Sequence, residues 1–282
     1  MKYTRDFLGT ELSLSSSEDI SSELLSECYL KIEEFEKKYS RFIEGNYLDN
    51  LNIQKRAPLT KELKTLVELA NKTSEHTKWY YDISILPFLE NAGYGIKKEK
   101  LSEIYWYKNI EITESEIILH NNISIEFWSL WKWYLIDILY VILDKKLWDF
   151  IINFWGDIRV KWKKKILLED PYDNKKSIGE IEVKNFAIAS SSWIKRKFWE
   201  KHHIINPFTG ESKNEITSLF VTHKLATFAD MYATALFVSP LEIWIHLLEK
   251  IEWLEALIIC QNGKVIQTKK FNYNPHILWL KM

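Results

Sequence analysis

Glycine is scarce in this chain. Of its 282 residues, 8 are glycine and 13 are tryptophan, whereas glycine makes up about 7% of an average globular domain. Glycine serves where φ must be positive or where the backbone must approach a ligand closely. A chain this poor in glycine has to fill such positions with other residues.

Cysteine, net charge and long apolar runs are also lacking. Cys28 and Cys260 are too few and too far apart to predict a disulfide framework or a cysteine metal site, so we expect two buried apolar residues. A net charge of −1 gives no general attraction to nucleic acid or to an anionic membrane, and the basic run 161–165 indicates a solvated strand end or loop. No apolar run approaches the roughly 20 residues that span a bilayer. Because the first residues also lack the apolar core of a signal peptide, we expect a cytoplasmic location.

The hydrophobic pattern predicts one compact α+β domain over residues 1–282. Apolar residues recur at helical spacing over 16–38, from Thr60 onward and over 133–147, and Ser17 and Asp19 are the expected N-caps of the first helix. Strands are expected at 110–119, 150–153, 166–168 and 181–189, and at 256–260 paired with 265–269 through the turn Asn262-Gly263. Helices and strands mix without a βαβ repeat, which favours α+β over a doubly wound sheet.

Seven short motifs follow one another along the chain. The two most specific are HIINPFTG at 203–210 and ADMYATALFV at 229–238; the others are Phe7-Leu8-Gly9-Thr10, Tyr39-Ser40-Arg41-Phe42, Tyr81-Asp82-Ile83-Ser84, the segment 132–137 and the segment 153–157. In this order they resemble the ApbE-type FAD:protein FMN transferases, from about residue 7 to about residue 259. The resemblance implies a single α+β unit of mixed sheet and helices with a nucleotide cleft.

Tryptophan stands at many positions where that family has glycine. In the segment 126–137 these positions are Trp128, Trp131 and Trp133, and Trp155 replaces the first glycine of a Gly-Gly-Asp. The others lie at expected turns or helix ends: Trp79, Trp148, Trp162, Trp193, Trp199, Trp244 and Trp253. Our hypothesis is that the gene comes from a bacterial lineage that reads the UGA codon as glycine, and that the codon was translated here as Trp. The alternative is a Trp-rich divergent or inactive homologue.

Asp230 and Thr234 form the best candidate for a metal site. They are four residues apart in a segment, 226–238, that is expected to be helical, so both side chains project from one face. A carboxylate and a hydroxyl so placed can share a hard cation such as Mg²⁺. The resemblance implies the same pair as metal ligands, with Ser129 adding a contact through its backbone or hydroxyl. Ala233 stands where some members of the family have a second acid, which puts a second metal ion in doubt.

The resemblance also implies which residues hold the nucleotide. Glu126, where the family has Asp, is expected to bind a hydroxyl of the flavin nucleotide, and Lys132 to neutralise the pyrophosphate or position the target. His203 and the backbone of Ile204 are expected to border the pocket, with His203 and Asp230 as catalytic candidates. Asn153 and Asp157 are expected to organise a loop, and Asp157 is a second candidate base. Residues expected to line the flavin or adenine are Leu8, Phe42, Tyr80, Tyr81 and Asp82.

The implied reaction is a magnesium-dependent transfer of FMN from FAD to a Ser or Thr hydroxyl of a target protein, with release of AMP. FAD and a target with a flavinylation motif are the expected partners. Two alternatives stay open. Water as acceptor would give a metal-dependent FAD pyrophosphatase, and indole rings in the cleft would leave a flavin-binding or scaffold protein without turnover. Several of the Trp residues are therefore expected close to Asp230, Thr234 and Ser129.

Overall fold

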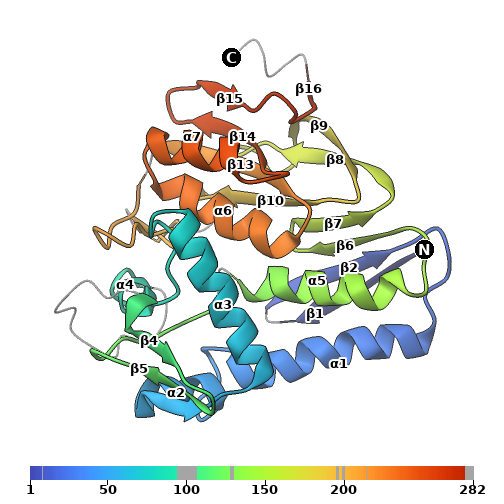
Figure 1. Ribbon diagram of the computed structural model, residues 1–282. Helices are drawn as coiled ribbons and strands as arrows, with labels where there is room; N and C mark the ends of the chain where they lie inside the picture. The colour runs from blue at the N-terminus through green and yellow to red at the C-terminus, as the bar shows by residue number, and fades with distance from the viewer. Residues whose placement is uncertain are drawn as a thin grey trace.

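The computed structural model describes residues 1–7, 9–93, 107–127, 130–194, 197–198, 201–213 and 215–276. An eight-stranded sheet, antiparallel at every pair, is its centre, with the strand order β1-β2-β6-β7-β10-β13-β14-β15 (Figure 1). The strands are β1 (Lys2–Phe7), β2 (Thr10–Ser15), β6 (Phe150–Phe154), β7 (Asp157–Lys161), β10 (Ala187–Ser192), β13 (Ile216–His223), β14 (Glu255–Cys260) and β15 (Val265–Gln267).

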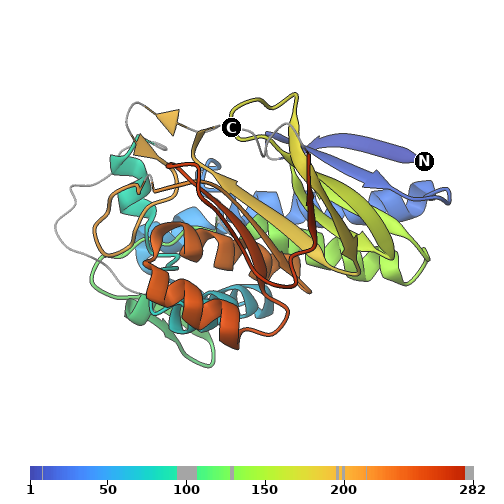
Figure 2. The ribbon, with the colours of Figure 1, turned by 90° about the horizontal axis from the view of Figure 1, so that it is seen from above.

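Two apolar layers cover the two faces of this sheet. On one face lie the helices α1 (Ser22–Tyr39), α2 (Tyr47–Gln54), α3 (Lys61–His76), α5 (Trp131–Asp144) and α6 (Ala226–Val238). Among them α5 and α6 contact the sheet directly, α1 packs on α5, and α3 packs on α6. The opposite face carries a small sheet of β16 (Tyr273–Pro275), β9 (Ser177–Lys184) and β8 (Lys163–Glu169), which closes a second core (Figure 2). The prediction of one compact α+β unit is confirmed.

Helices α1, α2 and α3 begin where short polar side chains accept backbone N–H groups. Thr60 caps α3, as the sequence predicts, and its Oγ1 accepts from the amide of Leu63 at 3.1 Å. The expected caps of α1 are wrong, because Ser21 is the N-cap and Ser17 instead donates its hydroxyl to Asp149 at 2.6 Å. The remaining helices are α4 (Leu86–Asn91), the 3₁₀ turn η1 (Tyr107–Asn109) and α7 (Leu241–Lys250).

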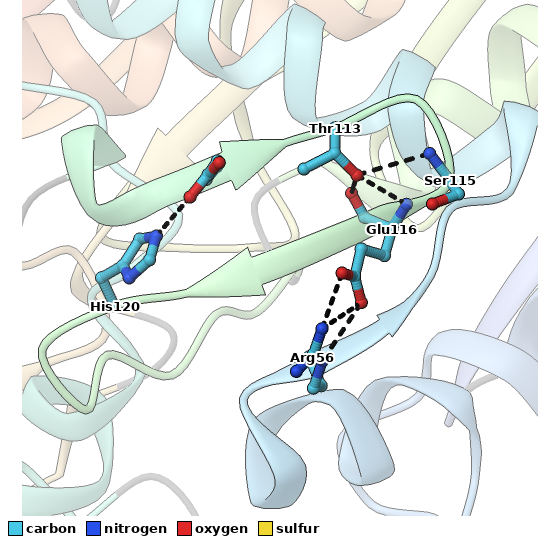
Figure 3. A network of polar contacts seen from close by, with 6 residues as sticks. Arg56, Thr113, Ser115, Glu116 and His120 are labelled. Atoms are coloured by element: carbon cyan, nitrogen blue, oxygen red, sulfur yellow. Dashed lines mark hydrogen bonds and ion pairs between the residues drawn. The ribbon is translucent and has the colours of Figure 1, made fainter.

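A third sheet packs beside the helices, with the order β3 (Arg56–Pro58), β5 (Glu116–Leu119) and β4 (Ile110–Ile112). The single strand expected over 110–119 is therefore two strands, because Thr113 closes a turn by accepting the amides of Ser115 and Glu116 (Figure 3). The guanidinium of Arg56 forks onto the Glu116 carboxylate at 2.6–3.1 Å (Figure 3). This exposed pair ties β3 to β5, and exposed pairs contribute little to stability.

The long strand expected over 181–189 is also two strands, β9 and β10. Asn185 has φ of 54° and turns the chain between them, and its Oδ1 accepts the amide of Trp162 at 2.6 Å. A two-stranded ribbon, β11 (Lys197–Phe198) with β12 (Lys201–His202), follows β10. The predicted hairpin of β14 and β15 is confirmed, with Gly263 at φ of 80° in its turn.

Among the described residues, four tryptophans have the backbone conformation that favours glycine. Trp79, Trp155, Trp162 and Trp253 have φ values of 67°, 55°, 72° and 63°. A side chain at such a φ crowds its own backbone, at a cost of about 1–2 kcal/mol. The structure therefore gives a backbone reason for glycine at these four positions. Trp131 and Trp133 differ, because they begin α5 and their side chains are buried in the core.

Candidate active site

A cavity of about 720 Å³ lies in the described part of the chain, and its volume is within the usual range of small-molecule sites. It lies at one end of the large sheet, where β2, β7 and β13 begin and β6 and β10 end. The start of α5 and the middle of α6 form one wall. The loop between β8 and β9 and the segment 203–205 complete it.

Six of the residues predicted from the sequence line this cavity together: Glu126, Lys132, His203, Ile204, Asp230 and Thr234. They come from three separate stretches of the chain, 126–132, 203–204 and 230–234, so the fold is what assembles them. The roles expected for them stay predictions. Leu8 and Ser129 lie outside the described residues.

The aromatic residues expected to line the flavin do not line the cavity. Phe42 is exposed and borders a much smaller pocket, which it shares with Glu126. Tyr80 packs its ring against Phe208, with 4.7 Å between the centroids. Tyr81 and Asp82 are buried, and Asp82 accepts hydrogen bonds from the amide and hydroxyl of Ser84 at 2.8 and 2.7 Å. In this structure they support the neighbouring chain turn and do not form a cavity wall.

Helix α6 brings Asp230 and Thr234 to the cavity on one face. Eleven of its residues are buried, which fixes how the helix is rotated against the sheet. Asp230 is 9% exposed and Thr234 is half-buried, and both side chains reach the cavity. Burial to this degree removes water from the Asp230 carboxylate, and a bound cation would compensate for the lost hydration.

Lys132 and Asp157 form a buried ion pair in the cavity wall. Lys132 lies in the first turn of α5, and Asp157 begins β7. The Lys132 ammonium also lies 5.7 Å from the centroid of the Trp155 ring. The sequence assigned Asp157 to loop organisation, and its pairing with Lys132 was missed because the two residues meet only in three dimensions.

The loop that carries His203 and Ile204 is held by its own polar groups. His202, which is buried, accepts the amide of Ile204 on Nδ1 at 3.2 Å and lies 3.1 Å from the carbonyl of Lys213 through Nε2. The loop ends at Gly210, with φ of 67°, where an added Cβ would lie 2.6 Å from the Phe88 ring. Glycine is required there both for the backbone angle and for the contact with α4.

Polar residues that the sequence analysis did not select form the rest of the wall. Serines 190, 191, 192 and 218 project from β10 and β13, and the acids Glu11, Glu169 and Asp170 lie at strand ends. The run Ser190-Ser191-Ser192 is a signal in the sequence that could have predicted a polar cavity wall at the end of β10. Together with Glu126, Asp157 and Asp230, six carboxylates and one lysine line the described part of the cavity. Such a lining attracts cations.

Within the described residues, no group of three His, Cys, Asp or Glu side chains could hold a metal ion. The expected donor set has another chemistry, since it combines the Asp230 carboxylate, the Thr234 hydroxyl and Ser129. Oxygen donors of this kind, in a cavity with excess negative charge, fit a hard cation such as Mg²⁺.

Of the four tryptophans expected near this site, Trp155 lines the cavity, Trp131 and Trp133 are not among its lining residues, and Trp128 lies outside the described residues. Trp148, Trp162 and Trp253 are exposed at the surface away from the described cavity lining. Among the described helices, none is long and apolar enough to cross a membrane.

Comparison with known proteins gives one consistent result. Residues 8–258 match the family model described as the ApbE family. The fold is similar to the ApbE protein from Thermotoga maritima, at 21% identity and a TM-score of 0.84, covering 96% of this chain and 97% of that one. It is also similar to the apo form of the flavinyl transferase ApbE from Pseudomonas stutzeri, at 15% identity and a TM-score of 0.82, covering 95% of this chain and 94% of that one. A third similar structure is the flavin transferase ApbE from Vibrio cholerae, at 18% identity and a TM-score of 0.80, covering 96% of this chain and 97% of that one. No curated protein gives a significant match.

Proposed function

Because the chain belongs to the ApbE family, we propose that it transfers FMN from FAD to a Ser or Thr hydroxyl of a target protein, releases AMP and uses Mg²⁺. The observation that carries the proposal is the meeting of Glu126, Lys132, His203, Asp230 and Thr234 around one cavity. Related proteins of the same fold are named flavin or flavinyl transferases.

Four of these side chains have a defined physical role in the proposed reaction, while His203 stays a catalytic candidate that borders the cavity. Asp230 and Thr234, with Ser129, would hold the cation, which offsets charge on the phosphates of FAD. Lys132 faces the same cavity and adds a positive charge to the pyrophosphate side. Glu126 is buried and supplies a carboxylate to hold a ribityl or ribose hydroxyl.

The reaction breaks the bond between the FMN-side phosphorus and the bridging oxygen, and forms a bond from that phosphorus to the hydroxyl oxygen of the target. AMP leaves with the bridging oxygen, and the hydroxyl proton needs an acceptor. Two carboxylates are candidates. They are Asp157, which is paired with Lys132, and Asp230, and both line the cavity.

One observation favours the alternative without turnover. The indole of Trp155 borders the cavity beside Lys132, where phosphates need space. If residue 155 is Trp in the protein made by its native cell, we expect the protein to bind flavin without transferring it.

The experiment is to mix the protein with FAD, Mg²⁺ and a protein acceptor containing candidate Ser and Thr residues. Transfer predicts equal amounts of AMP and of acceptor carrying FMN, measured by chromatography and by intact mass. Free FMN with AMP and an unmodified acceptor would instead show a pyrophosphatase. Binding of FAD without any AMP would show the alternative without turnover.

A further inference from the structure

Helix α6 begins without a cap of its own. The residue before its first turn is Leu225, which makes no side-chain cap hydrogen bond, and the first turn has no acidic residue. The first amides of any helix lack acceptors within the helix. The start of α6 therefore depends on a group from elsewhere in the fold.

That group is the carboxylate of Asp137, from the middle of α5. Its Oδ1 accepts the amide of Ala226 at 2.9 Å, and its Oδ2 accepts the amide and the hydroxyl of Thr227 at 3.0 and 2.7 Å. A carboxylate at a helix N-terminus is stabilised both by these bonds and by the helix dipole. Asp137 thus joins α5 to the first turn of α6 with both of its oxygens.

Asp137 is itself held in place from the sheet. Arg159 of β7 pairs with Oδ1, and both side chains are largely shielded from solvent, at 8% exposure for Arg159 and 16% for Asp137. The Arg159 guanidinium lies 3.7 Å from the centroid of the Tyr140 ring. The contacts of Asp137 therefore connect α5, β7 and α6 at one point, which we call the α6 anchor.

The α6 anchor lies close to the cavity but does not line it. Asp137 is absent from the described cavity lining. Lys132 precedes it in α5 by a little more than one helical turn, and Asp230 follows Ala226 by about one turn of α6. A shift of α6 against α5 would change the separation of Lys132 from Asp230 and Thr234. Displacements near 1 Å can reduce catalysis by about 100-fold.

We propose that Asp137 is a positioning residue that fixes α6 against α5, so that Asp230 and Thr234 are held at a set separation from Lys132 in the cavity wall. This inference rests on the proposed function, because it names the metal-binding face of α6 as what is positioned. Asp137 does not line the cavity in which the nucleotide and the cation would bind. It acts through the backbone of Ala226 and Thr227.

The test compares Asp137→Asn and Asp137→Ala with Asp149→Asn and Asp149→Ala. Asp149 is a matched control, because it is also a buried carboxylate that accepts from a Ser hydroxyl, a backbone amide and a Lys side chain. It precedes β6, at the end of that strand opposite the cavity. The measurements are Mn²⁺ binding by electron paramagnetic resonance, FAD binding by fluorescence, AMP release and melting temperature.

The expected result is that the Asp137 variants weaken Mn²⁺ binding by about tenfold or more, with Ala worse than Asn. The Asp149 variants should lower the melting temperature and leave Mn²⁺ and FAD binding within about twofold of the parent. Asp137→Asn keeps one oxygen acceptor, so it reports on positioning if Asp137→Ala does not fold.

Two outcomes would overturn the inference, and they differ in what else they overturn. Asp137 variants that bind Mn²⁺ and FAD like an active parent, and are only less stable, would show a purely structural role and leave the proposed function intact. A parent protein that binds neither FAD nor Mn²⁺ and releases no AMP would refute the proposed function, and the positioning role with it.

Discussion

Trp155 and Gly156 are the two central residues of the turn between β6 and β7, and both have positive φ, at 55° and 91°. Two-residue hairpin turns with positive φ at both positions strongly favour Gly, Asn and Asp. The amide of Trp155 also donates to the carbonyl of Glu11 at 3.0 Å, which fixes the turn against β2. The backbone at position 155 is thus suited to glycine, while the side chain is the largest one available.

We expect Trp155→Gly and Trp253→Gly to stabilise the protein by about 1 kcal/mol each, because the left-handed backbone is relieved and the indoles lose little burial at 48% and 45% exposure. Chemical denaturation measures the change. Trp133→Gly is the control, since its ring is 1% exposed and its loss should cost about 3 kcal/mol or more. Destabilisation by Trp155→Gly would contradict the assignment of position 155 to glycine.

The codon hypothesis makes its own prediction. Peptides of the protein purified from its native cell should carry Gly at residues 79, 155, 162 and 253, as read by tandem mass spectrometry. Trp at these four positions would refute it. The structure gives no backbone reason for glycine at Trp131 and Trp133, so those two peptides test whether the substitution extends beyond left-handed positions.

The pair of Lys132 and Asp157 allows the effect on stability to be separated from the effect on activity. Lys132→Met should destabilise the protein by about 3 kcal/mol, because it leaves Asp157 buried without its partner. The double variant Lys132→Met with Asp157→Leu should recover most of that loss, as measured by urea unfolding, and still release little AMP. Recovery of AMP release together with stability would show that Lys132 acts only in folding.

Asp230→Asn and Thr234→Val should each raise the Mg²⁺ concentration for half-maximal AMP release by about tenfold or more, because each removes an oxygen ligand. Asp144→Asn is the control, since this exposed carboxylate ends α5 and pairs with Lys161. An unchanged Mg²⁺ dependence in both site variants would rule out this face of α6 as the metal site.

Acid should remove a contribution of Asp149 to stability. Burial alone would raise the pKa of Asp149, but hydrogen bonds from Ser17 and Lys164 outweigh it and lower the pKa from 3.8 to about 2. Since the folded pKa lies below the unfolded one, this stabilisation is present above about pH 4 and is lost as the pH falls toward 2. The difference in urea midpoint between the parent and Asp149→Asn should therefore shrink from pH 5 to pH 3. A constant difference would contradict this assignment.

Local signals predicted much of the fold. Thr60 before an amphipathic run gives α3, and Asn262-Gly263 between apolar runs gives the hairpin of β14 and β15. Errors came where tertiary partners compete with local ones. Ser17 has a good capping side chain, but Asp149 binds it from far along the chain, and no pattern near Ser17 carries that information.

The candidate site divides in the same way. The spacing of Asp230 and Thr234 predicts their shared face, because helical geometry is local. The partner of Lys132 and the capping of α6 by Asp137 depend on how α5 packs against β7 and α6, which no spacing encodes. The aromatic residues were selected by resemblance alone, and Tyr81 shows that a matching motif can lie in the core.

The cavity wall runs from Glu11 near one end of the chain to Thr234 near the other. During synthesis, a nascent chain that has not yet released α6 from the ribosome would lack the wall that carries Asp230. Such a chain would have an incomplete, acidic cavity without the α6 residues that are proposed to bind the dinucleotide. Flavin binding would therefore begin only after α6 has emerged, so the cofactor substrate would have no part in guiding the folding of the segments made before it.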